Sequence, residues 1–157
     1  MAIYLKYEGI DGDATHEQHK KWIQCNSLQW GAGRAINTPT GRGANREASE
    51  VSVSEVTFTK ECDTASVKLF QEVLTSGKGK KVEIHLVTTG DPGDIYMTYE
   101  LEDTLVSSYS LSSGGDKPSE SISLNFAKFE YKFIMRDSKG NPTPSQALYD
   151  LRTTKKG

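Results

Sequence analysis

Cysteine is almost absent from this 157-residue chain, which has only Cys25 and Cys62. Two cysteines cannot build the disulfide framework that holds many small secreted domains together. The fold must therefore depend on a hydrophobic core. We expect both residues to be free, buried thiols in a reducing cytoplasm, with a single bridge between them as the alternative.

Long apolar runs and a basic surface are also missing. The opening residues, "MAIYLKYEGIDGD", contain no apolar run of signal-peptide length. No stretch approaches the roughly 20 apolar residues of a membrane helix. The net charge is −2, so the composition offers no basic footprint for nucleic acid. We predict a chain that is synthesised in the cytoplasm, with no membrane insertion and no nucleic acid partner.

Sequence motifs for catalysis or cofactor binding are lacking. His16 and His19 form an H-x-x-H pair, but two ligands do not define a metal site, and solvent-exposed histidines are the simpler interpretation. The glycines at 31–33 and 41–43 do not complete G-x-G-x-x-G, and "SGKGKK" lacks the phosphate-loop spacing. No G-x-S-x-G elbow is present. We therefore predict no metal, no cofactor, no catalytic residues and no enzymatic activity.

What the sequence does contain is apolar alternation with a period of two. In "AIYLKYE", Ile3, Leu5 and Tyr7 share one face, and "KKVEIHLVT" and "IYMTYELEDTLVSSYSL" repeat the pattern. About six to eight strands are expected. They predict a mainly-β fold, an antiparallel β-barrel or sandwich, as a single domain over residues 1–157.

One segment, "DTASVKLFQEVLTSG", predicts an α-helix that flanks the strands. Its apolar-leaning residues recur with helical spacing and should form one stripe. These residues are Ser66, Leu69, Phe70, Val73 and Leu74.

Two segments predict irregular structure. Residues 31–49, "GAGRAINTPTGRGANREAS", hold four glycines and little apolar content, so we expect a long extended loop. A loop of this length in a compact domain is usually functional or disordered. Residues 136–157 predict a polar C-terminal tail. In it "SKGNPTPS" is a loop, and "QALYDLR" is a short amphipathic turn or an edge strand.

The segment "SESISLNFAKFEYKF", residues 119–133, predicts a strand whose apolar face changes side at Phe126–Ala127. Two explanations remain open. A bulge at a barrel corner would restore one continuous face. Alternatively, the strand faces its own core first and a neighbouring subunit afterwards.

Three stretches resemble the haemolysin-coregulated protein (Hcp) family, which forms the inner tube of the type VI secretion system. They are "LVSSYSLSSGGDKPSESISLNFAKFEYKF" (105–133), "FTKECDTASVKLFQ" (58–71) and "YLKYEGIDGDATHEQHKKWIQC" (4–25). The similarity covers nearly the whole chain in order. It is weakest in the long loop, which lacks a long glycine run, and after Phe133.

This resemblance implies a small β-barrel with a flanking helix, assembled as a homohexameric ring. It further implies that the rings stack into a tube inside a contractile sheath, tipped by a VgrG-like spike protein. The tube is secreted without a cleaved signal peptide, and effectors bind in its lumen. The alternative is a monomeric β-barrel binding module for a peptide, lipid or glycan. A β-sandwich hydrolase has no motif in its favour.

Three groups of residues follow as candidate sites in a ring-forming protein. The long loop supplies candidates for ring stacking and subunit contact: Arg34, Ile36, Asn37, Thr38, Arg42 and Asn45. The hairpin loop after "VSSYS" supplies Ser112 and Ser113 as candidates for the lumen and its cargo, although an ordinary hairpin loop is the slightly favoured interpretation. The strand after the parity change supplies Phe129, Tyr131 and Phe133 as candidates that face another subunit.

Overall fold

The computed structural model describes residues 1–37, 40–41, 47–48, 51–75, 77–90, 93–153 and 155–156. Within these residues the chain forms one helix, α1 (Ser66–Leu74), and antiparallel strands. The strands are β1 (Ala2–Tyr7), β2 (Ile23–Cys25), β3 (Ser27–Gln29), β4 (Ala32–Gly33), β5 (Ile36–Asn37), β6 (Glu47–Ala48), β7 (Ser52–Val53), β8 (Val56–Glu61), β9 (Lys80–Val87), β10 (Ile95–Ser112), β11 (Ser119–Asn125), β12 (Lys128–Arg136), β13 (Pro142–Asp150) and β14 (Lys155–Lys156). The predicted mainly-β class with one helix is confirmed.

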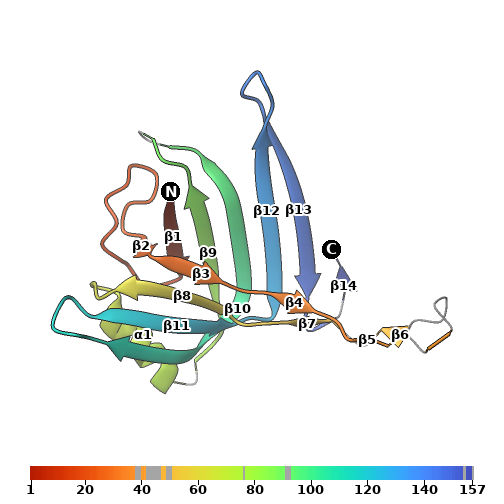
Figure 1. The fold of residues 1–157 in the computed structure, drawn as a ribbon. Coiled ribbons are helices and arrows are strands. Elements are labelled where there is room, and N and C mark those ends of the chain that lie inside the picture. Colours follow the sequence, from red (N-terminus) through yellow and green to blue (C-terminus); the bar gives the residue numbers. More distant parts are fainter. Residues whose placement is uncertain are drawn as a thin grey trace.

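Most of the strands belong to one strongly curved sheet (Figure 1). Its order is β14-β13-β12-β10-β11-β8-β3, and β9, β1 and β2 continue from the other side of β10. Strands β2 and β3, which end two branches of this sheet, are adjacent in the chain, and only Asn26 separates them. The Asn26 backbone N–H donates to the Thr59 carbonyl oxygen at 2.7 Å. This connection gives the sheet a barrel-like shape around one core.

Strand β10 turns the corner between the two halves of the sheet. Its first half pairs with β9 and β12, and its second half, from Leu105, pairs with β11. Asp103 lies at this corner with a φ of 54°, which is uncommon for a residue other than glycine. Gly79 packs directly against it, and a Cβ at Gly79 would meet the Asp103 Cα at 2.6 Å. The corner therefore requires glycine at position 79.

Residues 119–133 form two strands rather than one. β11 ends at Asn125 and β12 begins at Lys128. Between them, the Ala127 N–H donates to the Glu102 carbonyl at 3.0 Å, and the Ala127 carbonyl accepts from the Leu151 N–H at 2.8 Å. The chain thus stops pairing with the second half of β10 and begins to pair with its first half. This change resets which residues face inward along the chain. Neither a bulge within one strand nor one strand that changes faces describes this segment.

The core is built from residues that alternate along the strands, as the sequence predicts. Leu5 and Tyr7 are buried, and Ile3 packs against the same cluster. Phe126 and Phe129, on either side of the turn between β11 and β12, also belong to it. Each large apolar side chain buried in this way contributes about 1.5–3 kcal/mol relative to exposure.

Helix α1 buries a narrower face than its sequence predicts. Ser66 and Leu69 are buried and Val73 is partly buried against the core. Phe70 and Leu74, however, are exposed to solvent. A helix of nine residues contacts the sheet with few side chains, so the predicted stripe is only half covered.

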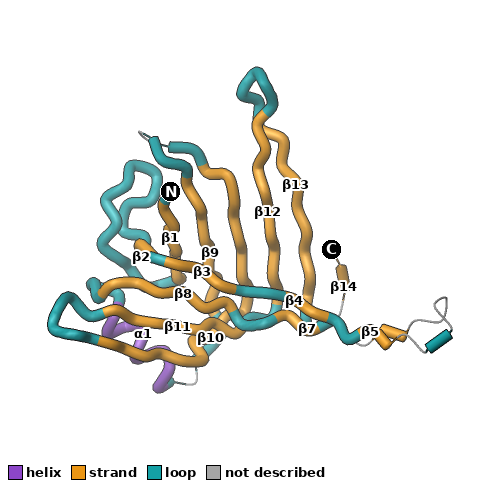
Figure 2. Tube along the Cα trace, in the orientation of Figure 1, coloured by secondary structure: helices purple, strands orange, loops and turns teal. Residues whose placement is uncertain are grey.

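Two projections extend from the core, and Figure 2 shows both. We call the ribbon of β4–β7 and β5–β6 the arm, and the hairpin of β12 and β13 the wing. In its described parts the predicted 31–49 loop is this arm, held by the pairs Ala32↔Val53 and Ile36↔Ala48. The predicted polar tail is largely strand β13, which pairs with β12 over its whole length. Strand β14 pairs with β13 only at Tyr149 and Asp150, so the edge-strand interpretation of "QALYDLR" is confirmed for residues 146–148.

Candidate functional site

The wing and the base of the arm form an apolar groove, which we call the wing groove. Its volume is about 250 Å³. Its lining consists of Trp30, Ala32, Val51 and Val53 at the base of the arm and of Phe129, Tyr131, Ala147, Leu148 and Tyr149 on the wing. The lining is apolar or aromatic throughout, which suits apolar side chains rather than a charged or polar ligand.

An aromatic cluster holds the floor of the wing groove in place. The Trp30 ring lies 4.6 Å from that of Phe129 and 5.7 Å from that of Tyr131, between ring centroids. Tyr131 in turn stacks on Tyr99 at 5.1 Å, with an interplanar angle of 12°. Aromatic pairs at these separations add to the free energy gained by burial. The groove is therefore pre-formed in the single chain.

The three predicted strand residues of the wing lie on one face of β12. Phe129 pairs with Tyr149, Tyr131 with Ala147, and Phe133 with Ser145. Phe129 is buried in the chain's own core, while Tyr131 and Phe133 are half-buried. Tyr131 is thus the predicted residue that joins the core to the open part of the wing groove.

The predicted loop residues lie on the arm as far as the structure describes them. Arg34, Ile36 and Asn37 are all exposed, and Ile36 places an apolar side chain in water far from the core. The remaining predicted residues, Thr38, Arg42 and Asn45, lie outside the described residues.

The two predicted lumen serines lie elsewhere, at the tip of the β10–β11 hairpin. Ser112 ends β10, and the Ser113 hydroxyl donates to the Asp116 carbonyl at 3.2 Å. Both are exposed. In Figure 1 this hairpin points away from the arm and the wing, so the structure does not bring the three predicted groups together.

A second exposed apolar surface lies on α1 and includes Phe70 and Leu74 of the predicted apolar stripe. Val67, Phe70 and Leu74 are 66%, 45% and 67% exposed. They follow the i, i+3, i+7 spacing of one helix face. Leu111 of β10 is also exposed, and the Phe70 ring packs 5.5 Å from Tyr109 on the same strand. We call Val67, Phe70, Leu74 and Leu111 the helix ridge.

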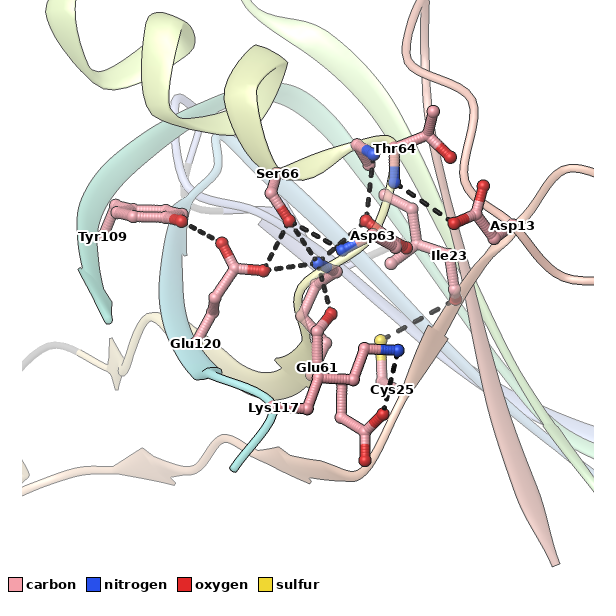
Figure 3. Close-up of polar contacts among 12 residues, drawn as sticks. Asp13, Ile23, Cys25, Glu61, Asp63, Thr64, Ser66, Tyr109, Lys117 and Glu120 are labelled. Carbon is pink, nitrogen blue, oxygen red and sulfur yellow. Dashed lines mark hydrogen bonds and ion pairs between the residues drawn. The ribbon is translucent and has the colours of Figure 1, made fainter. Parts of the chain in front are cut away.

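A buried charged network fastens α1 to the sheet (Figure 3). Lys60 of β8 and Glu120 of β11 are fully buried, with Nζ and Oε1 2.6 Å apart. Lys60 also lies 2.9 Å from the Asp63 carboxylate. Ser66, at the start of α1, donates to Glu120 Oε1 at 2.7 Å, and the Tyr109 hydroxyl donates to Oε2.

The network controls the ionisation of its members. Burial alone would raise the pKa of Glu120, but hydrogen bonds from Lys60, Tyr109 and Ser66 hold it below its usual value. Burial and the Glu120 carboxylate raise the pKa of Tyr109. The sequence contained a signal for this network. Lys60 shares strand parity with Val56 and Phe58, and Glu120 with Ile122, so both occupy positions that face the core.

Comparison with known proteins identifies the family. Residues 4–133 match the family model described as "Type VI secretion system effector, Hcp". The chain belongs to the Hcp family. The resemblance found in the sequence is thereby confirmed, and the family is a structural component of the type VI secretion system.

Solved structures agree with this assignment over nearly the full length. A structure described as a type six secretion system protein is 28% identical, covers 99% of both chains and has a TM-score of 0.89. Hcp1 of Salmonella typhimurium is 25% identical, with coverage of 99% and 98% and a TM-score of 0.77. Hcp2 of the same organism is 26% identical, with 99% coverage of both chains and a TM-score of 0.73. A comparison with curated proteins found no match.

The cysteines and histidines of this Hcp chain differ in burial. Cys25 and Cys62 are free thiols, as predicted, but Cys62 is only half-buried; burial raises the pKa of Cys25 to about 12. The histidines differ from the prediction, because His19 is buried rather than solvent-exposed. It lies between His16 and His85, and its ring stacks on Tyr4 at 4.7 Å.

Within the described residues there is no group of three or more histidine, cysteine, aspartate or glutamate side chains suited to a metal ion. The described part of the chain also contains no helix with the length and apolar character needed to cross a bilayer.

Proposed function

We propose that this Hcp protein assembles into homohexameric rings that stack to form the secreted inner tube of a type VI secretion system. The observation that supports this proposal most directly is the apolar surface outside the core. The wing groove and the exposed Ile36 of the arm are apolar surfaces that a monomer would leave in water. Large exposed apolar patches usually mark interaction sites.

The arm carries the contacts between rings in this proposal. It extends away from the core as a narrow ribbon, and its described strand pairs contain only two residues each. Such a ribbon gains stability from a partner more readily than from its own few contacts. Arg34, Ile36 and Asn37, together with the predicted Thr38, Arg42 and Asn45, are the proposed stacking residues. Tyr131 and Phe133 face a neighbouring subunit.

Membership of the family supports a wider assembly. The protein is made in the cytoplasm, polymerises inside a contractile sheath below a VgrG-like spike, and is secreted with the tube. Effectors bind in the channel, with Ser112 and Ser113 as the proposed contacts. The protein acts as a structural component rather than as an enzyme.

A monomeric binding module for a peptide, lipid or glycan receives less support. Such a site combines an apolar cavity with several converging polar groups. The wing groove is apolar, but its lining offers few polar atoms to orient a ligand. We therefore prefer assembly as the use of this surface.

Light scattering after size exclusion, followed by negative-stain imaging, tests the proposal. We expect a particle with six times the chain mass of 17.3 kDa and a ring-shaped projection. A strictly monomeric protein across micromolar to millimolar concentrations would overturn the proposal and favour the binding module.

A further inference from the structure

The helix ridge is a convex apolar surface that the fold leaves unpaired. Val67, Phe70 and Leu74 are exposed on α1, whereas Leu69 of the same helix is buried. Phe70 is held against Tyr109, so its ring is already ordered before any partner arrives. An ordered aromatic residue loses little conformational entropy on binding and is a common anchor of interfaces.

The wing groove has the complementary shape and chemistry. It is concave and apolar, and the cluster of Trp30, Phe129 and Tyr131 keeps it open. Its volume of about 250 Å³ lies below the range of about 300–1,000 Å³ usual for small-molecule pockets. A few inserted apolar side chains fit such a groove better than a ligand does.

The positions of the helix ridge and the wing groove decide whether the two surfaces can meet within one chain or only between two copies of it. In Figures 1 and 2, α1 lies at one side of the molecule, whereas β4, β7, β12 and β13, which carry residues lining the wing groove, lie toward the other side. The ridge of a chain therefore cannot reach its own groove. A second copy of this chain can supply the ridge, and its own groove then stays available for a third copy.

A contact of this kind is heterologous, because two different patches meet. Repetition of a heterologous contact either closes into a ring or continues as a filament. An isologous dimer, in contrast, would pair ridge with ridge and leave both grooves in water. The combination of one ridge and one groove in every chain thus favours cyclic assembly.

The ridge alone is too small to hold a ring together. A stable interface buries about 800 Å² on each partner, whereas a patch of this kind covers a few hundred Å². The rest of the wing borders the groove as well, and its exposed residues beside Ala147 can supply part of the remaining area. The ridge then acts as the anchor of a larger contact.

We infer that the helix ridge of one subunit inserts into the wing groove of the next subunit within the ring. This inference rests on the proposed function, since it assigns the two surfaces that join neighbouring subunits. In this arrangement, Leu74 of one subunit and Ala147 of the next lie on opposite sides of the same interface.

Directional cross-linking tests this assignment. In a Cys62→Ser background, which keeps the buried Cys25, the double variant Leu74→Cys with Ala147→Cys is treated with a short bismaleimide. We expect a ladder of covalent oligomers up to the ring. Each single variant alone gives no cross-link, and a mixture of the two single variants gives dimers only. Self-cross-linking by Leu74→Cys alone, or rings without a ladder, would overturn the inference.

Charge substitutions provide an independent measurement. Leu74→Asp and Ala147→Arg should each raise the dissociation constant of the ring at least about ten-fold, because each places a charge in an apolar contact. Met135→Asp is the matched control, since Met135 is 57% exposed and lies on the wing outside the groove. Thermal unfolding confirms that each variant is folded. Intact rings from both test variants would refute the inference and leave the proposed function standing, whereas a monomeric parent protein would refute both.

Discussion

The rings of His19 and His85 are hydrogen-bonded, with His19 Nε2 2.9 Å from His85 Nδ1. On its other side, His19 Nδ1 lies 2.9 Å from His16 Nδ1. A neutral imidazole has one donor and one acceptor nitrogen, so His19 can satisfy both contacts without a charge. The Trp22 ring lies edge-on to His19 at 4.7 Å, between centroids. The histidines therefore link the loop before β2 to strand β9.

This histidine chain predicts that acid destabilises the protein. Burial, followed by the neighbouring His85 and His16, lowers the pKa of His19 to about 4. Burial also lowers the pKa of His85, against the opposing effect of Glu83. The unfolded chain, with histidine pKa values near 6.5, binds more protons between about pH 6.5 and 4. The free energy of unfolding should therefore fall as the pH falls through this window, by up to about 1.4 kcal/mol per unit for one such group.

Urea unfolding followed by tryptophan fluorescence at pH 7.5, 6, 5 and 4 measures this effect. His19→Gln is the comparison, because it keeps a polar side chain but cannot titrate. The variant should be less stable at pH 7.5 and should show a shallower decline below pH 6.5. Equal slopes in the two proteins would contradict the role of His19.

The buried pair Lys60–Glu120 predicts a large loss of stability when one partner is removed. Lys60→Met leaves the Glu120 and Asp63 carboxylates without their cation, which should cost about 3–5 kcal/mol. The double variant Lys60→Met with Glu120→Leu should recover a large part of this loss, because the fully buried carboxylate is removed together with its cation and only the partly exposed Asp63 keeps an unpaired charge. Chemical denaturation of all three proteins provides the measurement.

A nearby exposed ion pair provides the matched control. Lys117 and Glu61 lie 3.3 Å apart, and both side chains are more than half exposed. Lys117→Met should change the free energy of unfolding by less than about 1 kcal/mol. A similar cost for Lys60→Met and Lys117→Met would show that burial does not govern the network.

The arm predicts a separation between folding and assembly. Deletion of Arg34–Asn45 removes a segment whose described residues contribute nothing to the buried core cluster. The shortened protein should unfold within a few degrees of the parent and yet fail to form stacked tubes, as judged by negative-stain imaging and by secretion. Normal tubes from the deletion variant would exclude the arm as the stacking element.

The β10–β11 hairpin predicts an effect on cargo rather than on the ring. Ser113→Gln adds bulk at an exposed tip, so a co-expressed effector should be retained less well while the ring remains intact. Ser138→Gln, in the loop between β12 and β13, is the matched control at another exposed tip. Equal retention of the effector by both variants and the parent would count against the lumen role of Ser113.

Local pattern was sufficient for much of the fold. The alternation of Ile3, Leu5 and Tyr7 predicts their inward face, because successive residues of a strand point to opposite sides. The helix also appears where its spacing predicts it, between Ser66 and Leu74. The family could be recognised at this level too, since its motifs are continuous stretches of sequence.

Other features depend on pairing between distant segments, and local pattern describes them poorly. The parity change at Phe126–Ala127 looks like a fault within one strand. It is a turn at the β10 corner, where Asp103 and Gly79 set the geometry from elsewhere in the chain. Strand β13 looks polar and tail-like, because an edge strand needs few apolar residues.

The sequence by itself thus determined the β-rich class, the single helix and the family, since these follow from periodicity and continuous motifs. Only the tertiary structure decided which apolar residues stay outside the core. Phe70 and Leu74 have the spacing of buried residues, but α1 contacts the sheet along a single narrow face. Lys60 and Glu120 are charged, yet they are buried because each satisfies the other. Burial depends on what packs against a side chain, and that is decided by segments far away in the sequence.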